Sequence, residues 1–431
     1  MYVFQPRVKG NRTDVPSDGG NQQYTVRNFN FNGQTAAAIV LLWDWGWTWQ
    51  QISIYGTPIG ILLQNPESKA VVPGSIYLMD SDFQNVGIAI QANKMNPDLS
   101  DTSVIVLDNI GMNGVTTVLA LANGAAAAIA PGTIDFYLFG NMKNGPSTFG
   151  SFGLAIPHPD DSLAPNSTPL YARRSYYVKS RPQYENYPLS SIVDVKSFGA
   201  KGDGTTDDTA AIQNALNSAT DSNVIYFPSG SYIITSTVKV PSTCRITGRV
   251  WSQLVAKGSA FADMLHPTPM IQVGQPGDTG TVEFSDMIFT SIGPLPGLVM
   301  VEWNVAASKT GSVGMWDTHF RVGGAIGTKL QAADCPANQP IQSKCIAAAL
   351  MLHITPTGNG YFENVWAWVA DHDLDDAANT QITVAVARGI LVESQGPTWL
   401  YGTASEHCML YQYNFEGSVN TFAGMIQTEC V

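Results

Sequence analysis

Alternating apolar and polar residues recur along the first third of the chain in short runs that end in Asn, Gly or Asp. The runs cover residues 24–33, 48–65, 75–91 and 102–115, and successive runs begin roughly 23 to 28 residues apart. Alternation predicts strands, and a repeat of this length without helices is typical of a solenoid. We therefore expect a parallel β-helix, in which stacked coils bury one continuous core.

A second series of strand-like runs follows, and it begins with VKSFGAKGDGTTDDTAAIQNALNSA at residues 195–219. This stretch predicts a strand, a tight turn at Gly202 and Gly204, and a helix over 209–216. The side-chain oxygens of residues 205–208 are expected to accept hydrogen bonds from the free amides of the helix start. The helix has one narrow apolar face, so we expect it to cover the open end of a second β-helix.

Between the two series lies a proline-rich segment with little apolar periodicity, which predicts a linker packed along the surface. The predicted fold is all-β, with two tandem right-handed parallel β-helices. Residues 1–156 are expected to form the C-terminal part of the first, 157–191 the linker and 192–431 the second. Only the second series begins with a capping helix, and the chain ends without one. We therefore expect a fragment whose second β-helix is incomplete at its C-terminus.

The amino-acid composition limits the classes of partner that a protein of this fold could bind. Charged residues make up 13% of the 431 residues, and the net charge of -12 argues against a polyanion such as nucleic acid. The sequence lacks the 18 or more consecutive apolar residues that a membrane helix requires, so no membrane partner is expected. The first residues also lack the apolar core of a secretory signal. A neutral partner fits this composition best.

Several motifs carry a resemblance to known proteins. FGAKGDGTTDDTAAIQ and IYFPSGSYIITSTVKVP resemble the pectate-lyase-like β-helix superfamily. More specific are WDWGWTWQ at residues 43–50, YYVKSRPQYENYP in the linker, VWAWVADHDLD, and GPTWLYGTASEHCMLYQY. Together they resemble glycoside hydrolase family 55, the fungal exo-β-1,3-glucanases, over nearly the whole chain.

The resemblance implies a secreted monomeric enzyme that hydrolyses laminarin-type β-1,3-glucan from the chain end and releases glucose or short oligosaccharides. It implies two β-helices side by side with the active site in the cleft between them, an inverting mechanism, and no metal or organic cofactor. Cys335 and Cys345 flank a short proline-containing loop, and spacing alone leaves a disulfide and two free thiols equally open. The resemblance favours the disulfide.

Glycoside hydrolysis needs a carboxylic acid that protonates the leaving oxygen. Glu406 is the first candidate, because neighbouring aromatic residues would raise its pKa and keep it protonated. From sequence alone, a surface Glu at a strand end is the commoner outcome. The resemblance reverses this preference, since it implies that the general acid lies in this Ser-Glu-His segment. Glu393 is the second candidate, and its alternative role is a turn residue after a buried strand.

Candidate sugar-binding residues surround Glu406. Asp371 and Asp373 have the alternate spacing of a calcium loop, but Asp376 stands where that loop needs Gly and Ile382 where it needs Glu. They are therefore expected to form a turn beside the cleft, with binding of a sugar hydroxyl as the alternative. The remaining candidates in this half are Trp399, His407 and Tyr411.

The tryptophans at positions 43, 45, 47 and 49 alternate strictly, so on a strand all four point to one face. An outward face would stack glucosyl rings, and an inward face would form a core layer, which is the commoner outcome. On the first reading Trp47 binds sugar. The resemblance implies that a hydroxyl and an amide from the first β-helix orient the attacking water. Thr48 and Gln34 are the candidates, with Gln22 and Gln23 as alternatives.

Two other functions stay open at this point. A polysaccharide lyase would need calcium-binding carboxylates and a basic residue, and both the acidic balance and the incomplete calcium loop count against it. A non-catalytic carbohydrate-binding or structural β-helix fits a chain that lacks coils.

Overall fold

The computed structural model describes residues 21–22, 24–41, 44–63, 75–92, 104–121, 126, 129–140, 142–144, 147–149, 166–167 and 174–429. Within them it has one α-helix, α1 (Thr209–Asn217), and otherwise β-strands and short 3-10 helices. The chain divides into unit 1, Met1–Tyr177 with Gly424–Ile426, and unit 2, Val178–Ala423 with Gln427–Val431. The predicted all-β class with parallel β-helices is confirmed. The linker boundaries at 157 and 191 stay a prediction.

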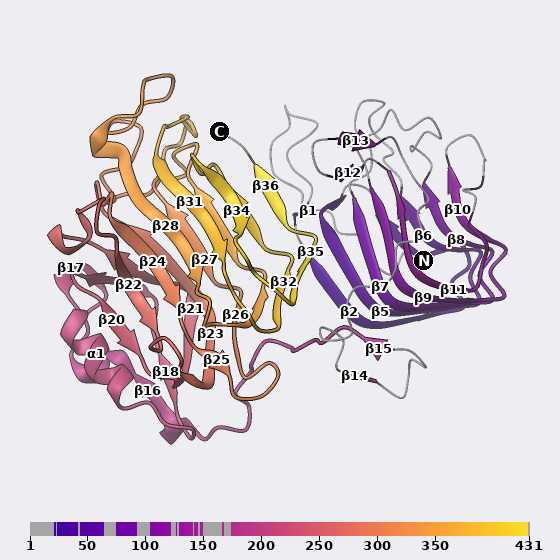
Figure 1. Ribbon diagram of the computed structural model, residues 1–431, viewed down its shortest axis with the longest axis horizontal. Coiled ribbons are helices and arrows are strands. Elements are labelled where there is room, and N and C mark those ends of the chain that lie inside the picture. Colours follow the sequence, from indigo (N-terminus) through magenta and orange to yellow (C-terminus); the bar gives the residue numbers. More distant parts are fainter. Residues whose placement is uncertain are drawn as a thin grey trace. The chain divides into compact units, whose positions relative to one another are not determined.

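Unit 1 stacks its strands in two sheets (Figure 1). The first contains parallel β2 (Thr25–Asn32), β5 (Trp47–Tyr55), β7 (Ile76–Gln84) and β9 (Ile105–Asn113), with antiparallel β11 (Thr133–Phe139) at its edge. The second contains β3 (Ala37–Leu41), β6 (Ile59–Leu63), β8 (Ile88–Ala92) and β10 (Thr117–Leu121). Three short pairs complete the unit: β1 (Asn21–Gln22) with β4 (Asp44–Trp45), β12 (Met142–Asn144) with β13 (Ser147–Phe149), and β14 (Asn166–Ser167) with β15 (Arg174–Ser175).

Each coil of the first sheet bends at a residue with positive φ. Gln51, Asp80 and Asn109 have φ of 57°, 49° and 58°, a conformation that Asn and Asp tolerate better than most residues. The residue at the bend is an extra one in the strand and shifts the alternation of inward and outward side chains by one position. Trp49 before the bend and Ile52 after it are therefore both 0% exposed in the core.

Unit 2 repeats this arrangement with longer coils. Its larger sheet contains β21 (Thr243–Ala256), β23 (Thr279–Ser291), β25 (Ala306–Ala307), β26 (Val313–Trp316), β27 (His319–Val322), β29 (Gly360–Glu363), β30 (Trp366–Val369), β32 (Thr398–Tyr401), β33 (Ala404–Glu406), β35 (Thr421–Gly424) and β36 (Gln427–Glu429). The same sheet begins with β16 (Ile192–Asp194), β17 (Asp203–Asp207), β18 (Val224–Tyr226) and β19 (Gly230–Ile234).

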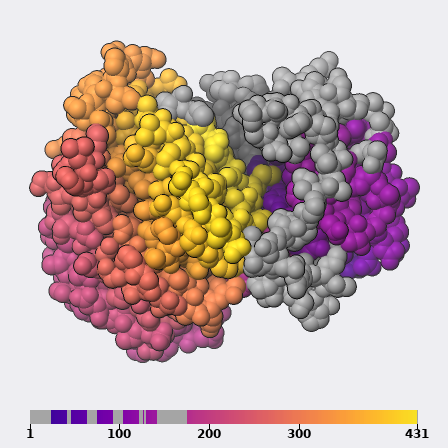
Figure 2. Space-filling model, viewed as in Figure 1, coloured from indigo at the N-terminus to yellow at the C-terminus, as the bar shows by residue number. Residues whose placement is uncertain are grey.

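A second sheet of six strands closes the coils of unit 2. Its strands are β20 (Val238–Val240), β22 (Thr268–Val273), β24 (Leu298–Trp303), β28 (Ile346–Ile354), β31 (Ala385–Val392) and β34 (Tyr411–Phe415). Aromatic rings fill the interior, where Trp303 packs 6.0 Å from Phe284 and 5.3 Å from Phe362 between centroids. The segment between β27 and β28 projects from the coils and is drawn in orange (Figure 2).

The α1 helix lies at one end of the coils of unit 2, beside β20 (Figure 1). Its apolar face is buried, with Ile212 and Ala215 at 0% exposure and Leu216 at 1%. The helix therefore covers the end of the stack, as its pattern predicts. The described part of this unit also contains the 3-10 helices η2 (Leu189–Ser191), η3 (Val195–Phe198), η4 (Ser259–Phe261) and η5 (Ser343–Cys345).

Two local predictions near the cap need correction. The residues from Val195 form the 3-10 helix η3 rather than a strand, because the strand β16 ends at Asp194. Asp207 Oδ1 accepts from the Thr209 amide at 3.0 Å, as expected of a cap. The Asp208 carboxylate instead accepts from the amides of Lys201 and Gly202, at 2.6 and 3.0 Å, and thereby holds the turn before the helix.

Candidate active site

The outer face of the larger sheet of unit 2 carries two stacked rows of side chains, which we call the Glu406 face. In register along β27, β30, β33 and β36, the first row is Arg321, Trp368, Glu406 and Glu429. The second row, two residues earlier on each strand, is His319, Trp366, Ala404 and Gln427. The residues between the rows, Phe320, Ala367 and Ser405, are 0% exposed and point into the coil.

Glu406 ends β33 and is 4% exposed. Its Oε1 accepts from Gln427 Nε2 at 2.8 Å, and the Trp366 side chain also donates to the carboxylate. Burial is the largest influence on Glu406 and raises its pKa, and the charge of Glu429 raises it further. The hydrogen bond from Trp366 and the charge of His407 lower the pKa, but each by less than burial raises it. A carboxyl group with a raised pKa stays protonated closer to neutral pH, which suits a general acid.

Trp366 presents a partly exposed aromatic ring beside this carboxyl group, and Trp368 packs against it. Their rings stack with centroids 5.4 Å apart and an interplanar angle of 26°. Trp366 is partly exposed, whereas Trp368 is 4% exposed and meets the edge of His372 at 5.8 Å. A flat aromatic surface next to a protonated carboxyl group suits a sugar ring with its glycosidic oxygen.

Two histidines order the edge of the Glu406 face. The Nδ1 of His407 lies 2.9 Å from Val369 O, and because a carbonyl only accepts, this nitrogen donates. Its Nε2 lies 3.8 Å from Glu429 Oε1. His372 Nδ1 lies 2.6 Å from Asp371 Oδ1. Of the predicted residues, Asp371 and His407 are therefore brought to Glu406, and both act on its pKa.

Asp373 takes part in a turn, the role that the sequence favoured over the alternative of a sugar contact. It is 2% exposed, and its carboxylate accepts from Gln331 Nε2 at 3.2 Å and from the Ala332 amide at 3.1 Å. These bonds tie the segment after β30 to the projecting segment between β27 and β28, so the carboxylate is enclosed by the protein. A disulfide joins Cys335 and Cys345 in the projecting segment, with Cα atoms 5.9 Å apart.

The structure does not bring Glu393 and Tyr411 to Glu406. Both lie on the six-stranded sheet or at its end, on the other side of the coil. Glu393 Oε2 lies 2.5 Å from His353 Nε2, which gives it an ion-pair partner on the neighbouring strand. Tyr411 begins β34 in register with Arg388, and burial raises its pKa.

Trp399 also differs from its predicted role. It is 2% exposed on β32 and packs 6.5 Å from Tyr361 between ring centroids. Its ring is therefore enclosed rather than available for stacking on a sugar.

In unit 1, the tryptophan alternation gives a core layer and not a sugar platform. Trp47 is 1% exposed and stacks on Trp49 with centroids 5.5 Å apart in the hydrophobic core. Thr48 is 0% exposed, and its hydroxyl has no hydrogen-bond partner among the described residues. Gln34 donates from Nε2 to Asn32 O at 3.1 Å in its own turn. The side chains of Trp45 and Gln22, and the whole of Trp43 and Gln23, lie outside the described residues.

Of the eight residues in the two rows of the Glu406 face, sequence reasoning named only Glu406; the others include Trp366, Trp368, Gln427 and Glu429. The strict spacing of the two tryptophans in VWAWV was the available signal, since it matches the spacing in WTWQ. From the sequence, this spacing indicates only the family resemblance, because no local pattern relates this strand to the strand of Glu406.

A family model described as "Rhamnogalacturonase A/epimerase, pectate lyase-like" matches residues 192–284. A "Probable glucan endo-1,3-beta-glucosidase" of Arthroderma benhamiae is 51% identical over 257 residues, 59% of this chain and 29% of that protein. A "Glucan 1,3-beta-glucosidase" of Cochliobolus carbonum is 38% identical over 420 residues, 95% of this chain and 52% of that protein. The resemblance to glucan 1,3-beta-glucosidases is confirmed.

A third relative has a different name. The "Non-secreted LysM effector LysM15" of Penicillium expansum is 41% identical over 362 residues, which cover 83% of this chain and 25% of that protein. The chain thus spans about half of the Cochliobolus glucosidase and a smaller share of the other two relatives. Among the described residues, no helix is long and apolar enough to cross a membrane.

Proposed function

We propose that this chain hydrolyses β-1,3-glucan with Glu406 as the general acid. The observation that carries the proposal is a buried carboxyl group of raised pKa in register with Trp368 and hydrogen-bonded by Trp366. The Arthroderma and Cochliobolus relatives are named for enzymes that act on 1,3-β-linked glucan, and their names supply the substrate class. Since the chain spans about half or less of their length, the activity of the chain itself is part of the proposal.

In this mechanism Glu406 gives its proton to the glycosidic oxygen as the bond from that oxygen to the anomeric carbon breaks. The partly exposed Trp366 holds the sugar ring against the acid by stacking, and the buried Trp368 packs against Trp366. Water attacks the anomeric carbon from the opposite side and gives its proton to the solvent, which returns a proton to Glu406 after the inverted product leaves. Action from the chain end and inversion both follow from the resemblance, as does the role of Thr48 or Gln34 in orienting the water.

We infer that the protein works outside the cell. The Cys335–Cys345 disulfide supports this, because disulfides persist in oxidising compartments and are rare in the cytosol. The resemblance to fungal glucanases points the same way.

The test replaces Glu406 with Gln, which keeps the size and the hydrogen bond from Gln427 but removes the transferable proton. Turnover of laminarin is expected to fall by roughly 100-fold or more, as for a positioned general acid. Glu393→Gln is the matched control, because that residue pairs with His353 on the other sheet and should leave turnover near the parent value. Near-parental turnover of the Glu406 variant, or loss of activity in the Glu393 variant alone, would refute the assignment.

A further inference from the structure

Residues 178–187, which we call the strap, cross the outer face of unit 2 at a distance from Glu406. Lys179 Nζ lies 2.6 Å from Glu283 Oε1 on β23. Trp316 on β26 donates from Nε1 to the backbone oxygen of Lys179 at 3.1 Å, and the Lys179 ammonium lies 5.0 Å from the Trp316 ring centroid. Arg181 of the strap also pairs with Asp286 on β23, so ion pairs and the Trp316 contact fix the strap to the strands that it crosses.

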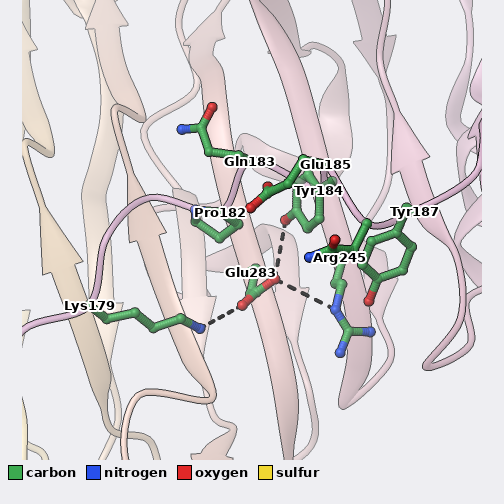
Figure 3. A pocket seen from close by; sticks show the side chains of 9 residues that line it. Lys179, Pro182, Gln183, Tyr184, Glu185, Tyr187, Arg245 and Glu283 are labelled. Atoms are coloured by element: carbon green, nitrogen blue, oxygen red, sulfur yellow. Dashed lines mark hydrogen bonds and ion pairs between the residues drawn. The ribbon is translucent and has the colours of Figure 1, made fainter.

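A pocket of about 280 Å³ lies along the strap. Figure 3 shows Tyr184 and Tyr187 of the strap beside Arg245 and Glu283 of the sheet. The two tyrosine rings meet edge to face at 5.7 Å, and the Arg245 guanidinium lies 5.8 Å from the Tyr187 ring centroid. Ligand pockets usually hold about 300–1,000 Å³, so this one suits a single small group.

The charges in this pocket balance. Lys179 and Arg245 are matched by Glu283 and Glu185, and Glu283 has the two cations as partners at 2.6 and 3.6 Å. The Tyr184 hydroxyl also donates to Glu283 Oε2 at 3.2 Å, and burial, followed by the Glu283 charge, raises the pKa of Tyr184. Two cationic and two anionic side chains line the pocket, so it carries no net charge that would favour an ionic ligand. It favours a neutral one.

The rim adds hydrogen-bonding groups to the aromatic walls. Gln183, Glu185 and Asn186 are exposed on the strap, and Tyr187 is partly exposed. Amide groups donate to and accept from hydroxyls, and a carboxylate accepts from them, whereas the faces of tyrosine rings attract the polarised C–H bonds of a pyranose. A sugar is a neutral ligand with such a polar edge and an apolar face, so it fits this lining.

We propose that this pocket is a second glucan-binding site that holds one glucosyl unit away from the catalytic acid. The choice of β-1,3-glucan as its ligand rests on the proposed function. Glu283 on β23 is three coil steps from Glu406 on β33, so the two sites are separated by about 14 Å along the stack. A site on the outer surface of the same coils would keep the protein on an insoluble polymer while its catalytic site releases and engages chain ends.

The experiment counts binding sites with the full chain carrying Glu406→Gln, so that the probe is not hydrolysed. Laminaritriose is titrated by calorimetry, and two molecules are expected to bind each chain. Adding Tyr187→Ala removes a wall of the pocket and should leave one molecule bound. It should also weaken retention on an insoluble β-1,3-glucan by on the order of 10-fold, because one of two linked contacts is lost.

Tyr187→Phe is the matched control, since it keeps the ring and its contact with Arg245 and should keep both sites. If Tyr187→Ala lowers the unfolding midpoint, the exposed pair Gln183→Ala and Asn186→Ala takes its place. One bound molecule whatever stands at position 187, or none in any variant, would overturn the inference. Laminarin turnover of the unsubstituted chain and of Glu406→Gln judges the proposed function separately, because turnover does not enter the count of sites.

Discussion

Two tryptophan pairs in this protein have almost the same geometry and different surroundings. Trp47 and Trp49 of unit 1 stack at 5.5 Å with an angle of 21°, and Trp366 and Trp368 of unit 2 stack at 5.4 Å with an angle of 26°. The first pair is at most 1% exposed within the core, whereas Trp366 is partly exposed on the outer face. Alternation along a strand thus sets which residues share a face, and the rest of the coil decides where that face points.

Two buried carboxyl groups repeat the contrast. Asp80 of unit 1 is 0% exposed and accepts from Gln50 at 2.9 Å and from Asn109 at 2.6 Å. Burial raises its pKa to about 6, although these hydrogen bonds oppose the rise. Glu406 also has a raised pKa but lies against aromatic and titratable side chains. A raised pKa therefore identifies a buried acid, and only the neighbours of that acid distinguish a structural role from a catalytic one.

The largest effect that we expect concerns the stability of the tryptophan pairs. Trp47→Ala should lower the free energy of unfolding by about 3–5 kcal/mol, because it leaves a cavity in a closed core. Trp366→Ala should lower it by less than about 1 kcal/mol, since the ring is already partly hydrated. Denaturant unfolding of both variants measures the difference. Equal losses would show that the two pairs do not differ in the way described.

Asp80 provides the next test, through the pH dependence of stability. Because its folded pKa of about 6 lies above the ordinary 3.8, the folded protein holds the proton to higher pH than the unfolded chain does. The free energy of unfolding should therefore fall as pH rises from about 4 to about 6, by roughly 3 kcal/mol at most from this group. Asp80→Asn removes this titration, so its stability relative to the parent should rise over the same interval.

Asp203 is the control of opposite sign. Hydrogen bonds from Thr206 and Thr205 lower its pKa, so its contribution is present above its ordinary pKa and is lost as pH falls below that range. Asp203→Asn should therefore cost stability at neutral pH and lose that cost in acid. A constant difference between Asp80→Asn and the parent across pH would contradict the assignment of Asp80.

A smaller effect is expected on catalysis at Trp366. Trp366→Ala should lower kcat/KM on laminarin by on the order of 10-fold, mainly through KM, because a stacking surface is removed. Trp366→Phe loses the donor to Glu406. It keeps an aromatic ring for stacking, so KM should change little. The acid's pKa should rise further in both variants, because that hydrogen bond lowers it. A pH profile that does not move in Trp366→Phe would contradict the contact.

Much of the fold was predictable, because stacked coils impose their period on the sequence. Residues 47, 76 and 105 lie in one column of unit 1 at a spacing of 29, close to the predicted repeat. The Glu406 face was not predictable in this way. Phe320 pairs with Ala367 across a long insertion that hides the period, so no local pattern brings Trp366 to the strand of Glu406. Glu406 itself was found by resemblance, since a sequence gives no burial from which to derive a pKa.

The smallest effect concerns Thr48, whose predicted role in orienting water is still open. Its hydroxyl is buried and has no partner among the described residues, which costs stability unless the group serves another purpose. Thr48→Val keeps the shape, so we expect stability to be unchanged or to rise by about 1 kcal/mol, while laminarin turnover falls by on the order of 10-fold. Thr133, an exposed threonine on β11 of the same sheet, is the control, and Thr133→Val should alter turnover little. Unchanged turnover in Thr48→Val would remove Thr48 from the catalytic site. A loss of stability would show that the hydroxyl is bonded after all, and its burial would then need no catalytic explanation.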